Sequence, residues 1–155
     1  MSQPTLHPFH RPLGSTGLMV SPLGLGTVKL GRDQGVKYPS GFKIPDDGEA
    51  KMLLKLSRDL GINLIDTAPA YGRSEERLGP LLRGQRQDWV IVSKVGEEFD
   101  NGVSRHDFSG AIRGAQLNAA CNALKRILSI WYSCIQMAMT LRSSTNRKST
   151  RPWPS

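Results

Sequence analysis

Three titratable side chains of this 155-residue chain lie where apolar segments end or turn. Asp66 closes the run INLID, Lys94 closes the run WVIVSK, and Tyr71 lies between them. Taken singly, each has an ordinary structural explanation. An aspartate forms turns, a tyrosine packs its ring and leaves its hydroxyl in water, and a lysine extends its ammonium beyond a strand end. Residue type alone therefore does not indicate catalysis, and the surrounding elements must decide.

Other residues capable of chemistry lack the spacing that it needs. His7, His10 and His106 show no metal-ligand spacing, so we expect a surface or loop role for each. Cys121 and Cys134 are too few for a disulfide framework and form no CxxC pair. The sequence predicts no metal site.

The elements that must position the three residues alternate between strand and helix. A Gly-Ser-Thr-Gly turn within residues 11–21 predicts a β-hairpin, and residues 31–45 are typical of a long loop. Buried strands are expected at residues 22–28, 62–66 and 89–94. Helices are expected from Asp46, with Glu49 completing a capping box, to Gly61; after Ser74, which can serve as the N-cap, with a kink or early end at Pro80; and from Asp107 onward. The apolar face of the first helix should comprise Ala50, Leu53, Leu54 and Leu60.

Strands that alternate with helices and are apolar on both faces predict an α/β fold with a parallel sheet. Asp66 and Lys94 then lie at the carboxyl ends of adjacent strands. Periodicity alone leaves two arrangements open, an open doubly wound sheet and a closed barrel.

The stretch GINLIDTAPAYGRSEERLG, residues 61–79, resembles the aldo-keto reductase motif around the second strand of a (β/α)8 TIM barrel. LGSTGLMVSPLGLGT before it and WVIVSKVG after it agree in order and spacing. The resemblance covers residues 11–113 and is closest to the branch with bacterial reductases and channel β subunits. It implies the N-terminal third of such a barrel, a β-hairpin and about three βα units, followed by an unrelated tail.

The resemblance also implies roles. Asp66 matches the family's buried acid, Tyr71 its catalytic acid and Lys94 the lysine that ends the third strand. Hydride transfer from NADPH to an aldehyde or ketone leaves negative charge on oxygen, and a positioned acid must protonate it. A free phenol has a pKa of about 10. A nearby ammonium lowers such a value, and a carboxylate holds the ammonium in place.

Neighbours of the three residues receive structural roles. We interpret Gly72 and Ser93 as structural, and Arg73 and Glu75 as solvated or helix-end residues.

The charge of the chain is divided unevenly. Residues 1–113 hold 15 of the 21 Lys and Arg and all 13 Asp and Glu, a balance of +2. Residues 114–155 hold the other six bases and no acid, and they lack the histidine and the fourth strand that the family has there. This break predicts two parts, a partial barrel over 11–113 and a basic, non-family tail over 114–155 that we expect to be poorly ordered.

The missing pattern is compatible with a second reading frame. When the third base of each codon is joined to the first two of the next, three junctions are forced: Trp131–Tyr132 gives valine, Met137–Ala138 glycine and Met139–Thr140 aspartate. From Ala115 the frame can spell SVERSLQRLETDFIDLVLVHSDGND, which resembles the family's fourth strand with its histidine. We therefore hypothesise a frameshift from one base lost near codons 109–115.

The expected function is that of an NADPH-dependent reductase of small carbonyl compounds, truncated in this chain and therefore inactive, without tight NADPH binding. The segments that bind the cofactor's phosphates are expected to be absent. Two alternatives remain open: a nucleic-acid or anion-binding protein using the basic tail, and a non-catalytic partner of full-length paralogues. No apolar run approaches the roughly 20 residues of a membrane helix, and the N-terminus lacks signal-peptide features. A cytoplasmic location without membrane contact is therefore expected.

Overall fold

The computed structural model describes residues 7–36, 38–100 and 102–124 of the chain. Expectations for residues 125–155, including Cys134 and the six bases of the tail, lie outside this range. None of the helices in the described ranges has the length and apolar character that a membrane crossing requires.

A three-stranded parallel sheet forms the centre of the fold. Its strands, in spatial order, are β3 (Gly24–Gly26), β4 (Leu64–Asp66) and β5 (Val90–Val92). Asp66 lies opposite Gly26 on one side and Val92 on the other, so all three strands end level with one another. The expected parallel α/β sheet is thus confirmed, and within the described residues it does not close into a barrel.

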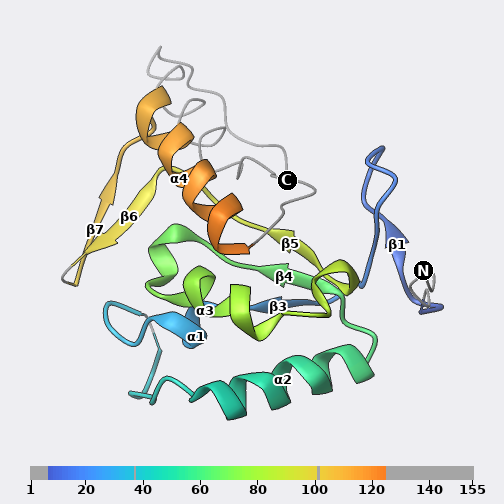
Figure 1. Cartoon of the computed structure of the whole chain (residues 1–155). Coiled ribbons are helices and arrows are strands. Elements are labelled where there is room, and N and C mark those ends of the chain that lie inside the picture. Colours follow the sequence, from blue (N-terminus) through green and yellow to red (C-terminus); the bar gives the residue numbers. More distant parts are fainter. Residues whose placement is uncertain (1–6, 37, 101, 125–155) are drawn as a thin grey trace, which may run out of the picture.

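Antiparallel hairpins lie at the two ends of this sheet (Figure 1). The expected N-terminal hairpin pairs β1 (Arg11–Pro12) with β2 (Met19–Val20) and leads into the amino end of β3. A second hairpin of β6 (Glu97–Asp100) and β7 (Val103–His106) follows β5 at the carboxyl ends of the strands. The sequence did not predict this second hairpin.

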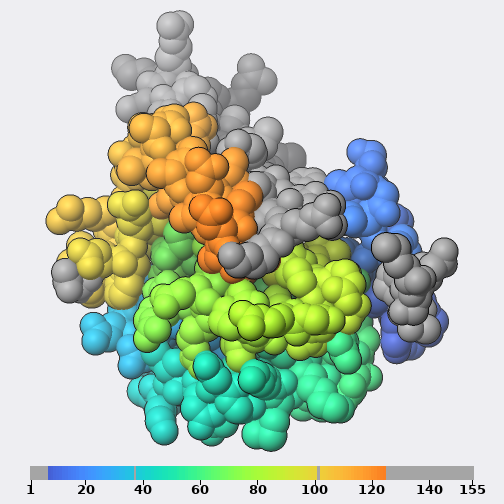
Figure 2. All heavy atoms as spheres, viewed as in Figure 1, coloured from blue at the N-terminus to red at the C-terminus, as the bar shows by residue number. Residues whose placement is uncertain are grey.

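The helices differ in detail from the expectation. They are α1 (Val28–Gly31), α2 (Asp47–Asp59), α3 (Ser74–Leu81) and α4 (Gly110–Leu124), with short 3₁₀ turns η1 (Pro69–Tyr71) and η2 (Arg86–Asp88). The capping box of Asp46 and Glu49 is confirmed, and α3 ends one residue after Pro80. Helix α3 lies between α2 and α4 and contacts both (Figure 2).

Two local predictions were wrong. Ser74 does not cap α3 but is its first residue, because its hydroxyl turns inward and donates to Thr27 Oγ1 at 2.9 Å. Helix α2 buries Ala50, Leu54 and Ser57, whereas Leu53 and Leu60 of the expected face are 39% and 65% exposed. Ser57 continues the i, i+4, i+7 spacing of the inner face, and Leu60 lies beyond the last turn of the helix.

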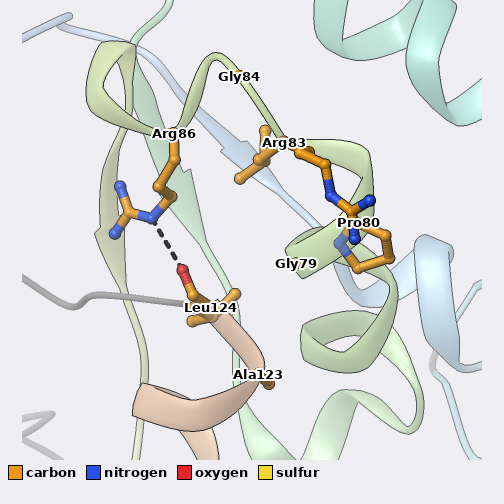
Figure 3. Close-up of a pocket in the computed structure, with 8 residues that line it drawn as sticks. Gly79, Pro80, Arg83, Gly84, Arg86, Ala123 and Leu124 are labelled. Carbon is orange, nitrogen blue, oxygen red and sulfur yellow. Dashed lines mark hydrogen bonds between the residues drawn. The ribbon is translucent and has the colours of Figure 1, made fainter.

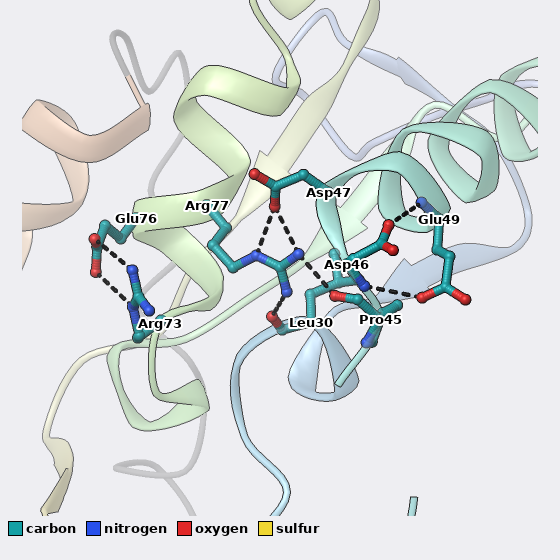
Figure 4. Close-up of polar contacts among 8 residues, drawn as sticks. All are labelled: Leu30, Pro45, Asp46, Asp47, Glu49, Arg73, Glu76 and Arg77. Atoms are coloured by element: carbon teal, nitrogen blue, oxygen red, sulfur yellow. Dashed lines mark hydrogen bonds and ion pairs between the residues drawn. The ribbon is translucent and has the colours of Figure 1, made fainter. Parts of the chain in front are cut away.

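Arg77 ties α3 to the segment that begins α2 (Figure 4). Its guanidinium donates to both the carbonyl of Leu30 and that of Pro45, at 2.5 and 2.8 Å. It also holds the Asp47 carboxylate through two nitrogens at 3.1 and 2.7 Å. The Arg77 side chain is only 14% exposed, so its hydrogen bonds to the two carbonyls have little access to competing water, whereas the Asp47 side chain is 69% exposed.

We predict that Arg77→Lys destabilises the protein by about 2 kcal/mol. An ammonium cannot reproduce the planar fork that serves two carbonyls and a carboxylate together. Urea denaturation measures the change. Arg73→Lys is the matched control, because Arg73 forms an exposed ion pair with Glu76 in the same helix and its replacement should leave the midpoint unchanged. Equal midpoints for the two variants would contradict the assignment.

Candidate active site

The Lys94 ammonium lies at the centre of a cluster at the carboxyl ends of β4 and β5. It donates to the Asp66 carboxylate, to the carbonyl oxygen of Thr67 at 3.1 Å and to the hydroxyl of Tyr71 at 3.1 Å. An ammonium has three N–H donors, and these three acceptors use all of them. The structure therefore brings together the three residues singled out in the sequence and fixes the position of the charge.

The Tyr71 hydroxyl takes the accepting role in this contact. Since an ammonium can only donate, the phenolic oxygen must accept and its own proton is free to point to another acceptor. The Lys94 nitrogen also lies 4.7 Å from the centre of the Tyr71 ring. Tyr71 thus presents a proton while a positive charge lies beside the oxygen that would lose it.

Two glycines allow Tyr71 to reach this position. A Cβ on Gly31 would lie 2.3 Å from the Tyr71 carbonyl oxygen and 2.1 Å from the Ser74 nitrogen. Gly72 has φ of +60°, and a Cβ there would lie 2.3 Å from the Gly31 carbonyl oxygen. The backbone after η1 therefore packs directly on the end of α1. The structural interpretation of Gly72 agrees with this arrangement.

Glu75 lies beside the cluster and is buried. The residue is 8% exposed, and its carboxylate accepts a hydrogen bond from the hydroxyl of Ser93, which precedes Lys94. Burial raises the pKa of the Glu75 carboxyl above its ordinary value; the hydrogen bond from Ser93 and the charge of Lys94 act in the opposite direction. A buried acid thus connects the first turn of α3 to the end of β5.

A larger pocket lies away from the lysine cluster. A cavity of about 390 Å³ opens between the C-terminal part of α3 and the end of α4, where Arg86 Nε donates to the Leu124 carbonyl at 3.2 Å (Figure 3). It shares no residue with the lysine cluster. The smaller pocket includes Lys94 in its lining and is the one adjacent to the chemistry. No group of three or more metal-ligating side chains occurs in the part of the chain that the structure describes.

Comparison with known proteins agrees with this geometry. The model of the aldo/keto reductase family matches residues 22–129, more than half of the chain. The chain belongs to the aldo/keto reductase family.

Solved structures and curated relatives show the extent of the likeness. A putative aldo-keto reductase of Pseudomonas aeruginosa is 57% identical with a TM-score of 0.71, over 90% of this chain and 58% of that one. Pyridoxal 4-dehydrogenase of Microbacterium luteolum is 42% identical over 59% of this chain. A probable voltage-gated potassium channel subunit beta of Oryza sativa is 35% identical over 68% of it.

The chain spans 25% and 32% of these two curated relatives, respectively. The reductase neighbours have the TIM-barrel fold expected from the sequence, so the described part of this chain corresponds to part of a TIM barrel. The family match continues past residue 113, the expected end of the resemblance, and runs through α4.

Glu75 was misjudged from the sequence in one respect. It lies in the first turn of α3, as expected of a helix-end residue, but it is not solvated. Its spacing from Leu78 and Leu82, three and seven residues on, places it on the buried face of the helix, and this signal was present in the sequence. Arg73, at the N-cap of α3, is exposed as expected.

We predict that Glu75 makes stability fall as the pH rises. Its pKa is raised in the folded state, so the folded chain binds the proton more tightly than the unfolded chain does. The contribution of Glu75 to the free energy of unfolding is fully present below its ordinary pKa of about 4.5. It is lost progressively as the pH rises through the raised pKa of the folded state. Glu75→Gln keeps the shape but cannot ionise, so its stability advantage over the native chain should grow with pH in urea denaturation from pH 4 upward.

Glu98→Gln, on the exposed face of β6, is the control and should follow the native pH dependence. A constant difference between Glu75→Gln and the native chain at all pH values would contradict the prediction.

Proposed function

We propose that Asp66, Tyr71 and Lys94 form the proton-delivering site of an NADPH-dependent reductase that converts small aldehydes and ketones to alcohols. The observation that carries the proposal is the hydrogen bond from Lys94 Nζ to the Tyr71 hydroxyl at 3.1 Å, with Asp66 holding the ammonium from the other side. Roles of this kind follow from the family, and the geometry supports their transfer to these positions.

The site residues act on the substrate oxygen. When bound, the nicotinamide supplies a hydride to the carbonyl carbon. The carbonyl oxygen takes the Tyr71 proton, the C=O double bond becomes a C–O single bond, and the phenolate left on Tyr71 lies against the Lys94 ammonium. Asp66 and the Thr67 carbonyl keep that ammonium in place, so no rearrangement is needed as the charge develops.

Two basic residues near these strand ends, Arg32 and Lys29, already have partners within the protein. Arg32 directs its guanidinium to the backbone carbonyls of Gln34, Gly35 and Ala70. The ammonium of Lys29 lies 4.3 Å from the centre of the Tyr38 ring. Both cations already have contacts within the protein, so we expect the chain as written to bind NADPH weakly and to show no turnover.

We further propose that residues from about 114 onward are translated out of frame, and that the partial barrel over 11–113 continues in the second frame. As written, α4 buries Gln116, Ala120 and Leu124, a face with a polar and a small residue. Over the same stretch the second frame can spell SVERSLQRLETDF, with valine, two leucines and phenylalanine spaced four, three and four residues apart. That spacing is compatible with a continuous apolar helix face. The support for the hypothesis comes from the three forced junctions, Trp131–Tyr132, Met137–Ala138 and Met139–Thr140, which agree with the family's pattern.

Sequencing of the gene across codons 105–145 tests the frame directly. We expect one additional base near codons 109–115, after which the frame encodes the fourth strand and its histidine. A nucleotide sequence that encodes the chain as written would show that no base was missed in sequencing. The three site residues would then belong to a decayed gene.

Turnover tests the site. In the frame-restored protein we expect oxidation of NADPH by an aldehyde, followed at 340 nm, and a decrease in kcat of about 100-fold or more for Tyr71→Phe. Tyr38→Phe is the matched control and should keep full activity, because the ring of Tyr38 contacts Phe42 and Lys29, and among the described residues no hydrogen bond joins it to Asp66, Tyr71 or Lys94. The chain as written should show neither turnover nor a low-micromolar Kd for NADPH. Full activity of Tyr71→Phe would reject the assigned role.

A further inference from the structure

The backbone of Lys94 lies just beyond the hydrogen-bonded part of the sheet. In the described part of the chain, the last backbone hydrogen bond between the segments of β4 and β5 runs from the Thr67 nitrogen to the Val92 carbonyl at 2.9 Å. Lys94 follows Val92 by two residues. The sheet therefore does not by itself fix the point from which the Lys94 side chain starts, and side-chain contacts of the intervening residue take that role.

The intervening residue, Ser93, is buried and bonded. It is 4% exposed, and its hydroxyl donates a hydrogen bond to the carboxylate of Glu75, which is itself 8% exposed. A serine hydroxyl has a single hydrogen to donate, so this bond fixes the Ser93 side chain and with it the backbone that leads into Lys94. Because both groups are buried, water competes little for the bond.

The start of α3 holds the acceptor, Glu75, in place. The preceding residue, Ser74, lies 3.3 Å from the hydroxyl oxygen of Thr67. Thr67 in turn offers its carbonyl oxygen to the Lys94 ammonium at 3.1 Å. Two routes from α3 therefore converge on Lys94: one reaches its ammonium through Thr67, and the other reaches its backbone through Ser93.

The hydrogen bond from Ser93, more than charge, links Glu75 to the site. Burial raises the pKa of the Glu75 carboxyl; of the two influences that lower it, the bond from Ser93 is larger than the charge of Lys94. The ammonium of Lys94 pairs directly with Asp66 instead. A neutral acceptor of the same shape as Glu75 should therefore serve equally well.

We propose that Glu75 is a positioning residue of the candidate active site: by accepting the hydrogen bond from Ser93, it holds Lys94 where the ammonium meets the Tyr71 hydroxyl. The proposal rests on the proposed function for the part that Lys94 plays in proton delivery. The positioning itself requires only residues of this chain. All of them precede codons 109–115, so they are the same in either reading frame.

Acetylation of Lys94 in the full chain measures how firmly its amine is held. The free amine attacks acetic anhydride, an N–C bond forms, and acetate and a proton leave. An amine bound to three acceptors reacts slowly, because it must leave them before it attacks. The rate at Lys94 is divided by the rate at Lys51, an exposed lysine of α2, in the same sample by peptide mass spectrometry. Urea denaturation of each variant shows whether the fold is intact.

Two substitutions of Glu75 differ in one property. Gln and Met have about the length of Glu, but only Gln can accept the hydrogen bond from Ser93. We expect Glu75→Met to raise the Lys94 ratio about tenfold, and Glu75→Gln to keep it within about twofold of the native value. Glu76→Met is the matched control and should leave the ratio unchanged, because the Glu76 side chain is 69% exposed and pairs with Arg73.

Ser93→Ala removes the donor of the same bond. Its ratio should rise as in Glu75→Met, and the double variant should show no further rise, because the two side chains act as one unit. An unchanged ratio in Glu75→Met, an equal rise in Glu75→Gln, or additive rises in the double variant would each overturn the proposal. So would faster acetylation of every lysine in Glu75→Met with a lower urea midpoint, since that pattern reports general loss of the fold.

This experiment and the turnover experiment can fail independently. A higher Lys94 ratio in Glu75→Met without turnover in the frame-restored protein would reject the proposed function and keep the positioning role. Turnover in the frame-restored protein with an unchanged ratio would reject the role of Glu75 and keep the reductase site.

Discussion

The arrangement at the carboxyl ends of the strands depends on one ammonium group whose three donors are all used. Lys94 can hold its place beside Tyr71 only because Asp66 and the Thr67 carbonyl take its other two hydrogens. This requires β4 and β5 to end level, which the parallel pairing of Asp66 with Val92 provides. The sheet register is therefore a condition of the chemistry, since a shift of one residue would turn the acid to the other face.

The start of α3 keeps Tyr71 and the strands together. Ser74 bonds to Thr27 beside β3 and to Thr67 beside β4, while Glu75 bonds to Ser93 beside β5. Two consecutive residues of one helix thus connect to the ends of all three strands. The polar contacts lie in a buried layer, where each bond competes little with water. The burial of the Glu75 carboxyl, which raises its pKa, is the cost of that connection.

The sequence predicted the sheet and the cluster well because both are encoded locally. Apolar runs mark β3 to β5, and a family motif in one continuous stretch contains both Asp66 and Tyr71. The sequence did not predict the β6–β7 hairpin, since EEFD and VSRH lack the apolar alternation of a half-buried strand. Its stability comes instead from contacts distant in sequence, the stacking of Arg32 on Phe99 and the bonds of Gln116, which no local pattern reveals.

Helix α4 bears on the frame hypothesis in two ways. Its packing against α3 relies on Gly79, where a Cβ would lie 2.1 Å from the Ala123 carbonyl oxygen, so this contact is made with backbone that any helical sequence supplies. Gln116 argues against the hypothesis. Its buried side chain forms hydrogen bonds to Gly96 and Glu97, and such satisfied polar groups are typical of sequences under selection. A serine, which the second frame can encode next to this position, is too short to span both groups. The hypothesis therefore requires that residues other than Gln116 hold the β6–β7 hairpin in the frame-restored protein. Arg32 and Phe108, which also contact the hairpin, precede codons 109–115 and are the same in either frame.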